Sequence, residues 1–535
     1  MNADPPGKLA PEPKELGKVS DKEVQLHQDG PTQSLKRNIG GLAIIGLGMS
    51  ICNGWAAMSS TIVIGLAQGG TAVVLYGLIF TSAINVCLAL TLGEMAAAYP
   101  SAGGQYVWSS ILAGPRMKRA MSFVVGWTTI FSWITIRPYP SQVASVVIIS
   151  AEVIFALVQT YQPLFVIQRW QVFLVYMAVN TASILCNLFA LQRLPRMGTF
   201  FLCFSTIIFL AILITCVAAA PTHQSNEFVW GTYTNEIGWT SSFVVVVTGA
   251  VNPAYVFAGL DGAIHIAEDC RRPARAVPYA LLSTVGMGFL TGFVMSVGLL
   301  YSIQDLDAAT SSELPFLAII VQATGSQAAG AVFMTAFLLV LLVSSNSVHQ
   351  PTSRLIWSFA RDGGLPYSAH VGSVHPTLHV PVIPLLISWT GVTILGALYV
   401  ASTTVYNSII ACCIVLGNVS FAIPSVQLLL RGRKMREGRW LRLGMLGWVV
   451  NGVTVAWTAI TLVMWLFPLE PDPAPADMNY SVAVLGVMAI LAGLDWLAVR
   501  KSFSGPDVED LALIEDEEPA RRCSDAATMV DGSRE

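Results

Sequence analysis

Long apolar stretches alternate with short polar segments along this chain, from residue 40 to residue 499. A helix can cross a bilayer when about 20 consecutive residues are mainly apolar, because it satisfies its own backbone hydrogen bonds there. The pattern therefore predicts about twelve membrane-spanning helices. We place them at residues 40–68, 71–97, 120–151, 170–190, 198–219, 242–267, 276–302, 327–358, 382–401, 404–430, 444–467 and 480–499.

The composition favours a membrane protein over a soluble one. Hydrophobic residues make up 54% of the chain and charged residues 11%, and the mean hydropathy is +0.63. Soluble domains carry about a quarter charged residues. The predicted fold class is an all-α polytopic membrane protein. We expect one transmembrane domain over residues 39–500, between a disordered N-terminal tail, residues 1–38, and an acidic C-terminal tail, residues 501–535.

Basic residues collect in alternate connecting segments. Of the 29 Lys and Arg residues, only Arg137 and Arg169 fall outside the two tails and the loops on one side of the predicted bundle. Loops on the other side carry acids such as Glu227, Asp305 and Glu470. Because cytoplasmic loops are enriched in Lys and Arg, we expect both termini in the cytosol. The net charge of −3 gives no reason to expect a nucleic-acid partner.

Cysteines and short motifs give no sign of catalysis. Most of the nine cysteines lie in the predicted spans, where cysteine is typically a small core residue. We therefore expect no disulfide set, no metal site and no cofactor. The chain also lacks a P-loop, a His-Glu-x-x-His motif and a nucleophile elbow in a sensible context, so we do not expect an enzyme.

Two predicted spans contain segments that suit a helix poorly. The first places Asn53 and Gly54 near its middle, and the sixth carries Pro253 and then Phe257-Ala-Gly-Leu-Asp-Gly262. Gly-interrupted helices in corresponding positions of two repeats are typical of the mid-membrane binding site of a transporter. Close helix packing is the alternative, because glycine is also common at helix contacts in membranes.

Ionisable residues in these spans indicate a functional cavity. Asp261 is the candidate for contacting a cationic amine or for proton coupling, because a buried acid in a membrane normally faces a cavity or a partner. His265 and Glu268 follow on the same helical face, with direct proton transfer and structural gating as alternatives. Arg137 could hold a substrate carboxylate, pair with an internal acid, or reach the membrane surface, and the sequence leaves these three roles open.

Four motifs in order carry a resemblance to a known family. They are Asn53-Gly-Trp-Ala-Ala57; Gly93-Glu-Met-Ala96 followed by Tyr99-Pro-Ser-Ala-Gly-Gly-Gln-Tyr-Val-Trp108; Phe257-Ala-Gly-Leu-Asp-Gly-Ala-Ile-His-Ile-Ala-Glu-Asp269; and Ser353-Arg-Leu-Ile-Trp-Ser-Phe-Ala-Arg-Asp-Gly-Gly-Leu-Pro366. With these motifs the chain resembles the amino acid–polyamine–organocation superfamily, within it the fungal amino acid/choline permease branch.

The resemblance implies a fold and a site. The fold would be two inverted five-helix repeats plus two further helices, with the first and sixth helices unwound at mid-membrane. The implied substrate-binding residues are Asn53, Gly54, Trp55, Trp133, Arg137, Phe257, Gly259, Asp261, Ser345 and Asn346. The implied gating or proton-coupling residues are Glu94, Gln105, His265 and Glu268. The chain departs from some proton-coupled relatives because its fifth span, 198–219, has no lysine.

The function expected from the residues and the resemblance is secondary active transport. We expect a proton symporter that imports a small nitrogenous solute (an amino acid, 4-aminobutyrate or choline) by alternating access. Trp55, Trp133 and Phe257 could form an aromatic cage for choline. A nutrient receptor with the same fold is the alternative. The expected partners are the solute, the proton and membrane lipid, and the expected location is the plasma membrane, with the vacuolar membrane as the alternative.

Overall fold

The computed structural model describes residues 39–133, 142–189, 194–468, 470–475 and 478–506. The N-terminal tail, Arg137 and most of the C-terminal tail lie outside these ranges. The described residues form helices, and their extended pairings are two isolated β-bridges, Ile39 with Cys270 and Gln68 with Asn235. The predicted all-α fold class is therefore confirmed.

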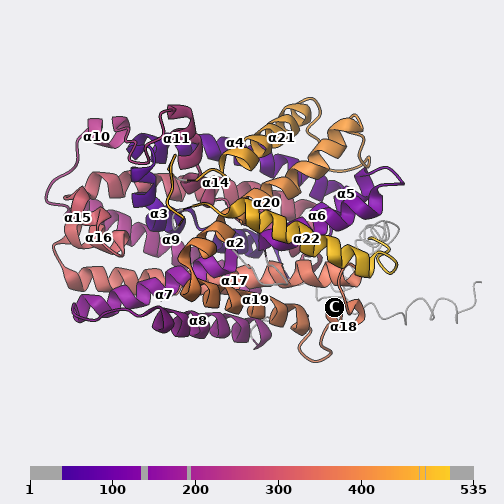
Figure 1. The fold of residues 1–535 in the computed structure, drawn as a ribbon, viewed down its shortest axis with the longest axis horizontal. Coiled ribbons are helices and arrows are strands. Elements are labelled where there is room, and N and C mark those ends of the chain that lie inside the picture. Colours follow the sequence, from indigo (N-terminus) through magenta and orange to yellow (C-terminus); the bar gives the residue numbers. More distant parts are fainter. Residues whose placement is uncertain (1–38, 134–141, 190–193, 469, 476–477, 507–535) are drawn as a thin grey trace, which may run out of the picture. The chain divides into compact units, whose positions relative to one another are not determined.

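Residues 41–269 form the first group of helices in the bundle (Figure 1). They are α2 (Gly41–Ile51), α3 (Gly54–Ala67), α4 (Gly70–Ala98), α5 (Gln105–Leu112), α6 (Lys118–Trp133), α7 (Gln142–Tyr161), α8 (Arg169–Phe189), α9 (Leu194–Ala219), α10 (Asn226–Gly231), α11 (Ser242–Gly249), α12 (Val251–Tyr255), α13 (Gly262–His265) and the short 3-10 helix η2 (Ala267–Asp269).

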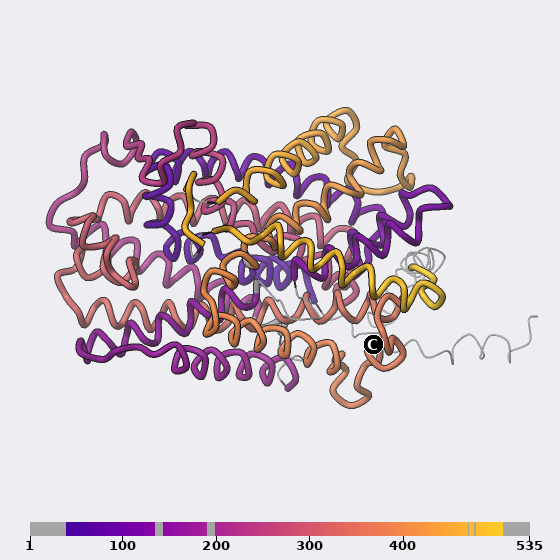
Figure 2. Tube along the Cα trace, in the orientation of Figure 1, coloured from indigo at the N-terminus to yellow at the C-terminus, as the bar shows by residue number. Residues whose placement is uncertain are grey.

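Residues 273–499 form a second group of helices in the same bundle. Its helices are α14 (Pro273–Ser302), α15 (Leu306–Thr310), α16 (Pro315–Thr324), α17 (Gln327–Arg361), α18 (Ser368–Val371), α19 (Val382–Ala401), α20 (Thr403–Leu430), α21 (Leu446–Met464) and α22 (Ser481–Val499). The last of these, yellow in Figure 2, packs against α20 and α6.

Eleven of the described helices, with α2 and α3 taken as one, are long and apolar enough to cross a membrane. Ten of the twelve predicted spans correspond closely to such helices, for example 382–401 to α19. The predicted end of the third span at residue 151 is wrong, because α7 continues through Glu152 to Tyr161. The predicted sixth span is not one continuous helix but a set of shorter ones, α11 to α13.

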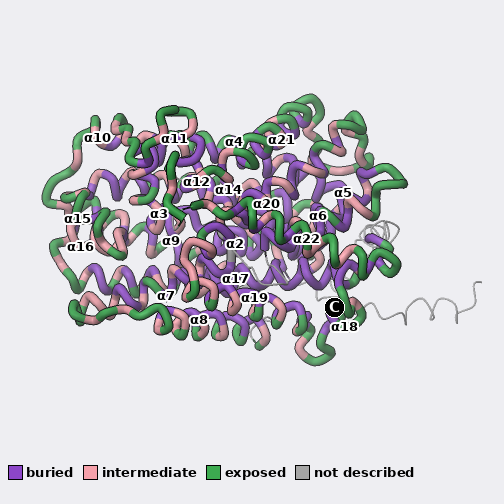
Figure 3. The backbone as a smooth tube through the Cα atoms, viewed as in Figure 1, coloured by how far each residue is buried: buried purple, intermediate pink, exposed green. Residues whose placement is uncertain are grey.

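Many large apolar side chains are exposed on the outside of the bundle. Figure 3 shows where exposed segments lie along the backbone. On α9, Phe200, Ile207 and Ile214 are all more than half exposed, at 68%, 63% and 61%. Their spacing of seven residues places them on one face of the helix. Exposure of such an apolar stripe to water is unfavourable, whereas lipid chains can cover it, as expected for a multi-pass membrane protein.

The predicted interruptions of the first and sixth helices are present. The first helix is broken at Cys52 and Asn53, between α2 and α3. The sixth is broken over residues 256–261, between α12 and α13, where the backbone forms turns. The two breaks lie close together, since α13 packs on α2 and α12 packs on α3. This pairing creates the site described below.

Basic residues mark one end of the bundle, which we call the basic end. It contains the segments 113–119, 270–275, 361–381, 431–443 and 500–506, which contact one another: Arg119, for example, donates to the Phe503 carbonyl. The segment 500–506 folds back here, and the buried Phe503 ring packs on Phe123 and Phe359. We call the other end, with α10, α15 and α16, the opposite end (Figure 1).

Candidate functional site

The break in the first helix is held by close packing. A Cβ at Gly54 would lie 2.1 Å from the carbonyl oxygen of Gly288 in α14, so only glycine allows this approach. Beside it, Asn53 Nδ2 and Trp55 Nε1 both donate to Ser205 Oγ of α9, each at 3.0 Å. These contacts fix the N-terminal end of α3 against two neighbouring helices.

The break in the sixth helix depends on backbone freedom. Gly259 has φ +83°, in the left-handed region that favours glycine. At Gly262 a Cβ would lie 2.8 Å from Ile51 and 3.0 Å from Trp133, so the chain comes close to α2 and α6 there. Asp261 lies between these two glycines, at the start of α13.

A central cavity of about 60 Å³ lies between the two breaks. Its wall comes from α2, α3, α7, α12 and α17, with Asn53, Ser60, Tyr255 and Ser344 as its polar side chains. Asn53 Oδ1 and Ser344 Oγ are buried without a hydrogen-bond partner among the described residues. One water needs about 10–15 Å³ in this measure, so the space suits a compact solute.

A second cavity, of about 30 Å³, lies elsewhere around the sixth helix, and we call it the Asp261 cavity. It is lined by Asn85, Ser132, Trp133, Ala254, Phe257, Ala258, Gly259, Asp261, Cys413, Ile414, Gly417, Asn418, Phe421, Trp457 and Trp465. The two cavities share only Ala258 among their lining residues. Asp261 is the only acidic or basic side chain among the residues that line either cavity.

Three side chains meet one oxygen of Asp261. Its Oδ2 lies 2.7 Å from Gln105 Nε2, 3.0 Å from Trp133 Nε1 and 3.2 Å from His265 Nε2. The other ring nitrogen of His265, Nδ1, lies 2.8 Å from the carbonyl oxygen of Ala102. Asp261 and His265 are nearly or fully buried, so this cluster is a polar junction within the bundle.

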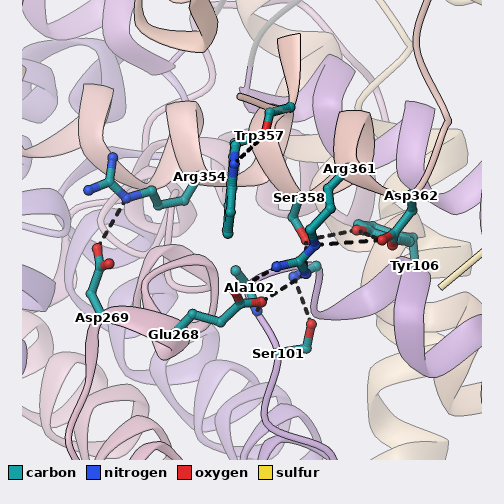
Figure 4. A network of polar contacts seen from close by, with 12 residues as sticks. Ser101, Ala102, Tyr106, Glu268, Asp269, Arg354, Trp357, Ser358, Arg361 and Asp362 are labelled. Carbon is teal, nitrogen blue, oxygen red and sulfur yellow. Dashed lines mark hydrogen bonds and ion pairs between the residues drawn. The ribbon is translucent and has the colours of Figure 1, made fainter. Parts of the chain in front are cut away.

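A network of ion pairs and hydrogen bonds surrounds Glu268 at the basic end (Figure 4). We call it the gate network, after the gating role that the sequence predicts for Glu268. Arg361 of α17 binds both carboxylate oxygens of Glu268, at 2.9 and 3.1 Å, and the Ala102 amide donates to Glu268 Oε1 at 3.3 Å. Next to it, Arg354 donates to Asp269 at 3.1 Å. These contacts tie the end of the sixth helix to the 101–105 segment and to α17.

Asp362 extends this network just beyond the end of α17. Its Oδ2 accepts from the Tyr106 hydroxyl at 2.9 Å, and its Oδ1 lies 3.8 Å from Arg361 Nε. Burial raises the pKa of Asp362 to about 6, although the charge of Arg361 and the Tyr106 hydrogen bond act in the lowering direction. Asp362 is therefore a group that can change charge near neutral pH.

This arrangement of broken helices and cavities agrees with the comparison to known families. The model of a family described as amino acid permease matches residues 39–490. The chain belongs to the amino acid permease family.

Several fungal relatives of the permease cover most of its length. A choline transporter of Saccharomyces cerevisiae is 33% identical over 508 residues, with 94% of this chain and 87% of the relative covered. The transmembrane transporter swnT of Metarhizium robertsii is 31% identical, with 86% and 91% covered. A 7-keto 8-aminopelargonic acid transporter of Saccharomyces cerevisiae is 25% identical, with 83% and 89% covered.

Solved structures share the fold of the permease at low sequence identity. A mutant of the manganese transporter of Eremococcus coleocola matches with a TM-score of 0.54 at 12% identity, and the match covers 88% of this chain and 99% of that transporter chain. At this identity the likeness supports the fold alone. It agrees with the predicted repeat architecture.

The structure divides the predicted substrate-binding residues of the permease among several places. Asn53 lines the central cavity. Gly54 and Trp55 face α14 and α9, as described above. Trp133, Phe257, Gly259 and Asp261 line the Asp261 cavity. Arg137 lies outside the described residues.

The remaining predicted residues lie further from the central cavity. In α17, Ser345 contacts Ser183, and Asn346 accepts from Asn187 at 2.9 Å, so both pair with α8. Glu94 is buried at the basic end, where Arg433, Arg439 and the Leu443 amide bind its carboxylate. Glu94 thus anchors the 431–443 loop to the end of α4. Gln105, His265 and Glu268 take part in the contacts around Asp261 and in the gate network.

Sequence reasoning missed Tyr255, Ser344 and the backbone of Ala102. Tyr255 lines the central cavity and bonds Ser145 of α7. Ser344 directly precedes the predicted Ser345, and a helical rotation of about 100° separates the faces of two such residues. A backbone group such as Ala102 leaves no signal in a residue pattern.

Proposed function

We propose that this permease is a secondary active transporter that carries a small amine, with choline as the leading candidate, together with protons. The solute binds in the central cavity. The basic end faces the cytosol and the opposite end faces outward, so transport toward the basic end is import. The plasma membrane is the proposed location.

The observation that carries this proposal is the convergence of two helix ends on an uncharged cavity. The C-terminal ends of α2, at Ile51, and of α12, at Tyr255, both reach the lining of the central cavity. Carbonyl groups at helix C-termini favour positive charge. The lining also holds the tyrosine Tyr255, whose ring can contact an ammonium group, and no basic side chain. The site therefore suits a compact cation.

The relatives support an amine as the solute, and the helix ends at the cavity are also compatible with an amino acid. The Saccharomyces cerevisiae relative that is 33% identical is named as a choline transporter. The N-terminal end of α3 also reaches the cavity, at Asn53 and Ala56, and helix N-termini favour negative charge. A solute with both charges, such as 4-aminobutyrate, is the second candidate for this reason.

The gate network supplies a means of alternating access. In the proposed cycle, the ion pair between Glu268 and Arg361 holds the basic end closed. Release of this pair would free the end of the sixth helix from α17. The opposite gate would then have to close in the same cycle, as alternating access requires.

The test is uptake by the purified protein in liposomes. We would measure radiolabelled choline, 4-aminobutyrate and neutral and basic amino acids, with an inward proton gradient. Ala57→Phe should reduce uptake at least about tenfold, because Ala57 lines the central cavity and a phenyl ring would fill it. Ile64→Phe is the matched control, since Ile64 belongs to the same helix and is 52% exposed on its outer face.

Each outcome decides between the candidates. Saturable choline uptake that only Ala57→Phe removes would support the proposal, and preference for an amino acid would move the second candidate forward. Uptake by Ala57→Phe at the wild-type rate would remove the central cavity from the pathway. If the folded protein transports no solute of the panel but binds one, the nutrient receptor becomes the better explanation.

A further inference from the structure

We propose that Asp261 and His265 together bind the coupling proton, in a place separate from the solute, and that this bound proton keeps the gate network closed. The inference rests on the proposed proton-coupled transport. It adds the proton site, its route and its connection to the gate.

The hydrogen-bond partners of His265 require an extra proton. A backbone carbonyl oxygen can only accept, so Nδ1 must carry a hydrogen to bond Ala102 at 2.8 Å. In a neutral imidazole, Nε2 is then an acceptor, yet it faces the carboxylate of Asp261 at 3.2 Å. Two acceptors in contact need a proton between them. The observed pair is therefore the proton-loaded form.

The proton-loaded pair carries no net charge. Asp261 Oδ2 also accepts from Gln105 Nε2 and Trp133 Nε1. One proton shared between a carboxylate and an imidazole that already carries a hydrogen on Nδ1 leaves the two groups neutral together, which is tolerable within the bundle.

Ala102 connects this pair to the gate network. Its carbonyl accepts from His265, and its amide donates to Glu268 Oε1 at 3.3 Å, where Arg361 is also bound. One peptide segment thus bonds both the proton site and the gate. Loss of the proton would leave Nε2 and Oδ2 as two facing acceptors, and the repulsion would turn one side chain away. The contact of His265 with Ala102 would then weaken, and with it the hold on Glu268.

The backbone around Asp261 can accommodate such a change. Gly259, in the left-handed region, and Gly262 stand on either side of it. Glycine reaches many backbone conformations at low cost, so this segment can rotate where an ordinary helix could not. The proton site is therefore placed on the part of the sixth helix that is free to move.

The proton and the solute use different cavities. Asp261 lines the Asp261 cavity, whose polar side chains include Asn85, Ser132 and Asn418, and it does not line the central cavity. The Asp261 cavity continues to Trp465, which follows the end of α21 toward the opposite end. A space of about 30 Å³ holds roughly two waters, enough to carry a proton along amide and hydroxyl groups.

Other titratable groups belong to the elements around the pair. They are Cys52 after α2, Tyr106 in α5, Cys413 in α20, Arg275 and Tyr279 in α14, His349, Arg354 and Arg361 in α17, and Glu268 and Asp269 in η2. His349 bonds Ser388 and Asn180 and not the pair. Cys52 lies within electrostatic reach of Asp261. Cysteine thiols are ordinarily protonated near neutral pH. Arg354 and Arg361 are paired with Asp269 and Glu268, so His265 is the group bonded to Asp261 that can exchange a proton.

The first experiment separates coupling from solute transport. In liposomes with the membrane potential held at zero, symport of one proton per solute sustains about tenfold solute accumulation per pH unit. A tenfold concentration ratio across the membrane has the same free energy for the proton and for the solute. Asp261→Ala removes the carboxylate and with it the bound proton, so it should abolish this accumulation while solute exchange between the two sides continues at a measurable rate. Cys412→Ala is the control, since Cys412 Sγ faces Ser481 and not the Asp261 cavity.

The second experiment reports on the gate itself. Cys270 is fully buried directly after η2, so its labelling by a membrane-permeable thiol reagent measures opening of the basic end. His265→Ala should label several times faster than wild type at the same pH. His265→Asn retains a donor near the position of Nδ1, so it should protect Cys270 better than His265→Ala, yet it should still lack proton-driven accumulation.

The outcomes are distinguishable from failure of the proposed function. No transport by wild type would reject proton-coupled transport itself. Wild-type accumulation by Asp261→Ala would overturn the proton site. Loss of exchange as well as accumulation in a folded Asp261→Ala protein would place the solute against Asp261 and overturn the separation of the two cavities. Equal Cys270 labelling in wild type and His265→Ala would overturn the link to the gate.

Discussion

The break in the first helix is held by close packing, whereas the break in the sixth helix is held by hydrogen bonds to an ionisable pair. At the first, Gly54 lies against the Gly288 backbone and Ser205 accepts from two side chains. At the sixth, a glycine with φ +83° precedes an acid that bonds a histidine. None of the residues in these contacts of the first break has an acidic or basic side chain.

This difference suggests a division of roles within one site. Packed backbone has few alternative arrangements, so the first break is suited to be a fixed wall of the central cavity. Hydrogen bonds that depend on one proton have two arrangements, so the sixth break is suited to be the moving part. Four substitutions follow, from the largest expected effect to the smallest. The first three test this contrast, and the fourth tests a titratable group outside both breaks.

Gly54→Ala should have the largest effect, on folding. Its Cβ would lie 2.1 Å from the Gly288 oxygen, and overpacking of a tight contact costs about 3 kcal/mol. We expect a large loss of folded protein and a much lower melting temperature in detergent. Gly286→Ala is the matched control in α14, because nothing lies within 4 Å of its Cβ position. Equal melting temperatures for the two variants would mean that the first break is not a fixed wall.

Ser205→Ala should destabilise the first break to a smaller extent. It removes the acceptor of Asn53 Nδ2 and Trp55 Nε1, and buried donors without a partner cost roughly 2 kcal/mol in total. The melting temperature and the solute affinity should both fall. Thr206→Ala is the control, since Thr206 Oγ1 bonds only the Leu202 carbonyl of its own helix among the contacts described. A Ser205→Ala protein that matches this control would contradict the expectation.

Gly259→Ala should affect turnover more than stability. A side chain in the left-handed region costs about 1–2 kcal/mol, which would bias the sixth helix away from the observed arrangement. We expect a several-fold change in the maximal uptake rate with a small change in melting temperature. The quantity to compare is the change in maximal uptake rate relative to the change in melting temperature. If Gly259→Ala lowered the melting temperature as much as Gly54→Ala, the proposed division of roles would fail.

Asp362→Asn should have the smallest effect, visible as a change in pH dependence. Burial raises the folded-state pKa of Asp362 to about 6, so the folded state binds this proton more tightly than the unfolded state. The stability contributed by the protonated form is then present at low pH and is lost as pH rises, by roughly 1 kcal/mol between pH 5 and pH 7. The melting temperature of wild type should decline over this interval, and that of Asp362→Asn should decline less. The same slope in both proteins would assign the effect to another group.

The sequence predicted the parts of this architecture that depend on apolar length and on backbone chemistry. Ten spans follow directly from apolar stretches, and the two breaks follow from Gly54 and from the Gly259 to Gly262 segment. The third span was misjudged because Glu152 interrupts its apolar pattern while the helix continues. A single acidic residue in the middle of an apolar helix does not force the backbone to stop there.

The direction of side chains around the breaks could not be predicted. Asn53 and Trp55 are two residues apart, yet only Asn53 lines the central cavity. Asp261 belongs to the predicted site by sequence, but whether it faces one cavity or another depends on the rotation of an unwound segment. Contacts across long separations, such as Glu94 with Arg433 and Arg439, also leave no local pattern.

The folded-back segment at the basic end has a practical consequence for labelling this protein. The fully buried Phe503 lies against Phe359, two residues before Arg361, and Ser502 approaches Gly363, whose φ of +81° and missing side chain admit it. A fluorescent protein joined after residue 506 would leave the folded-back segment 500–506 in place. A fusion made directly after Arg500 would remove these contacts with the end of α17, so the tag itself would alter the region that it is meant to report on.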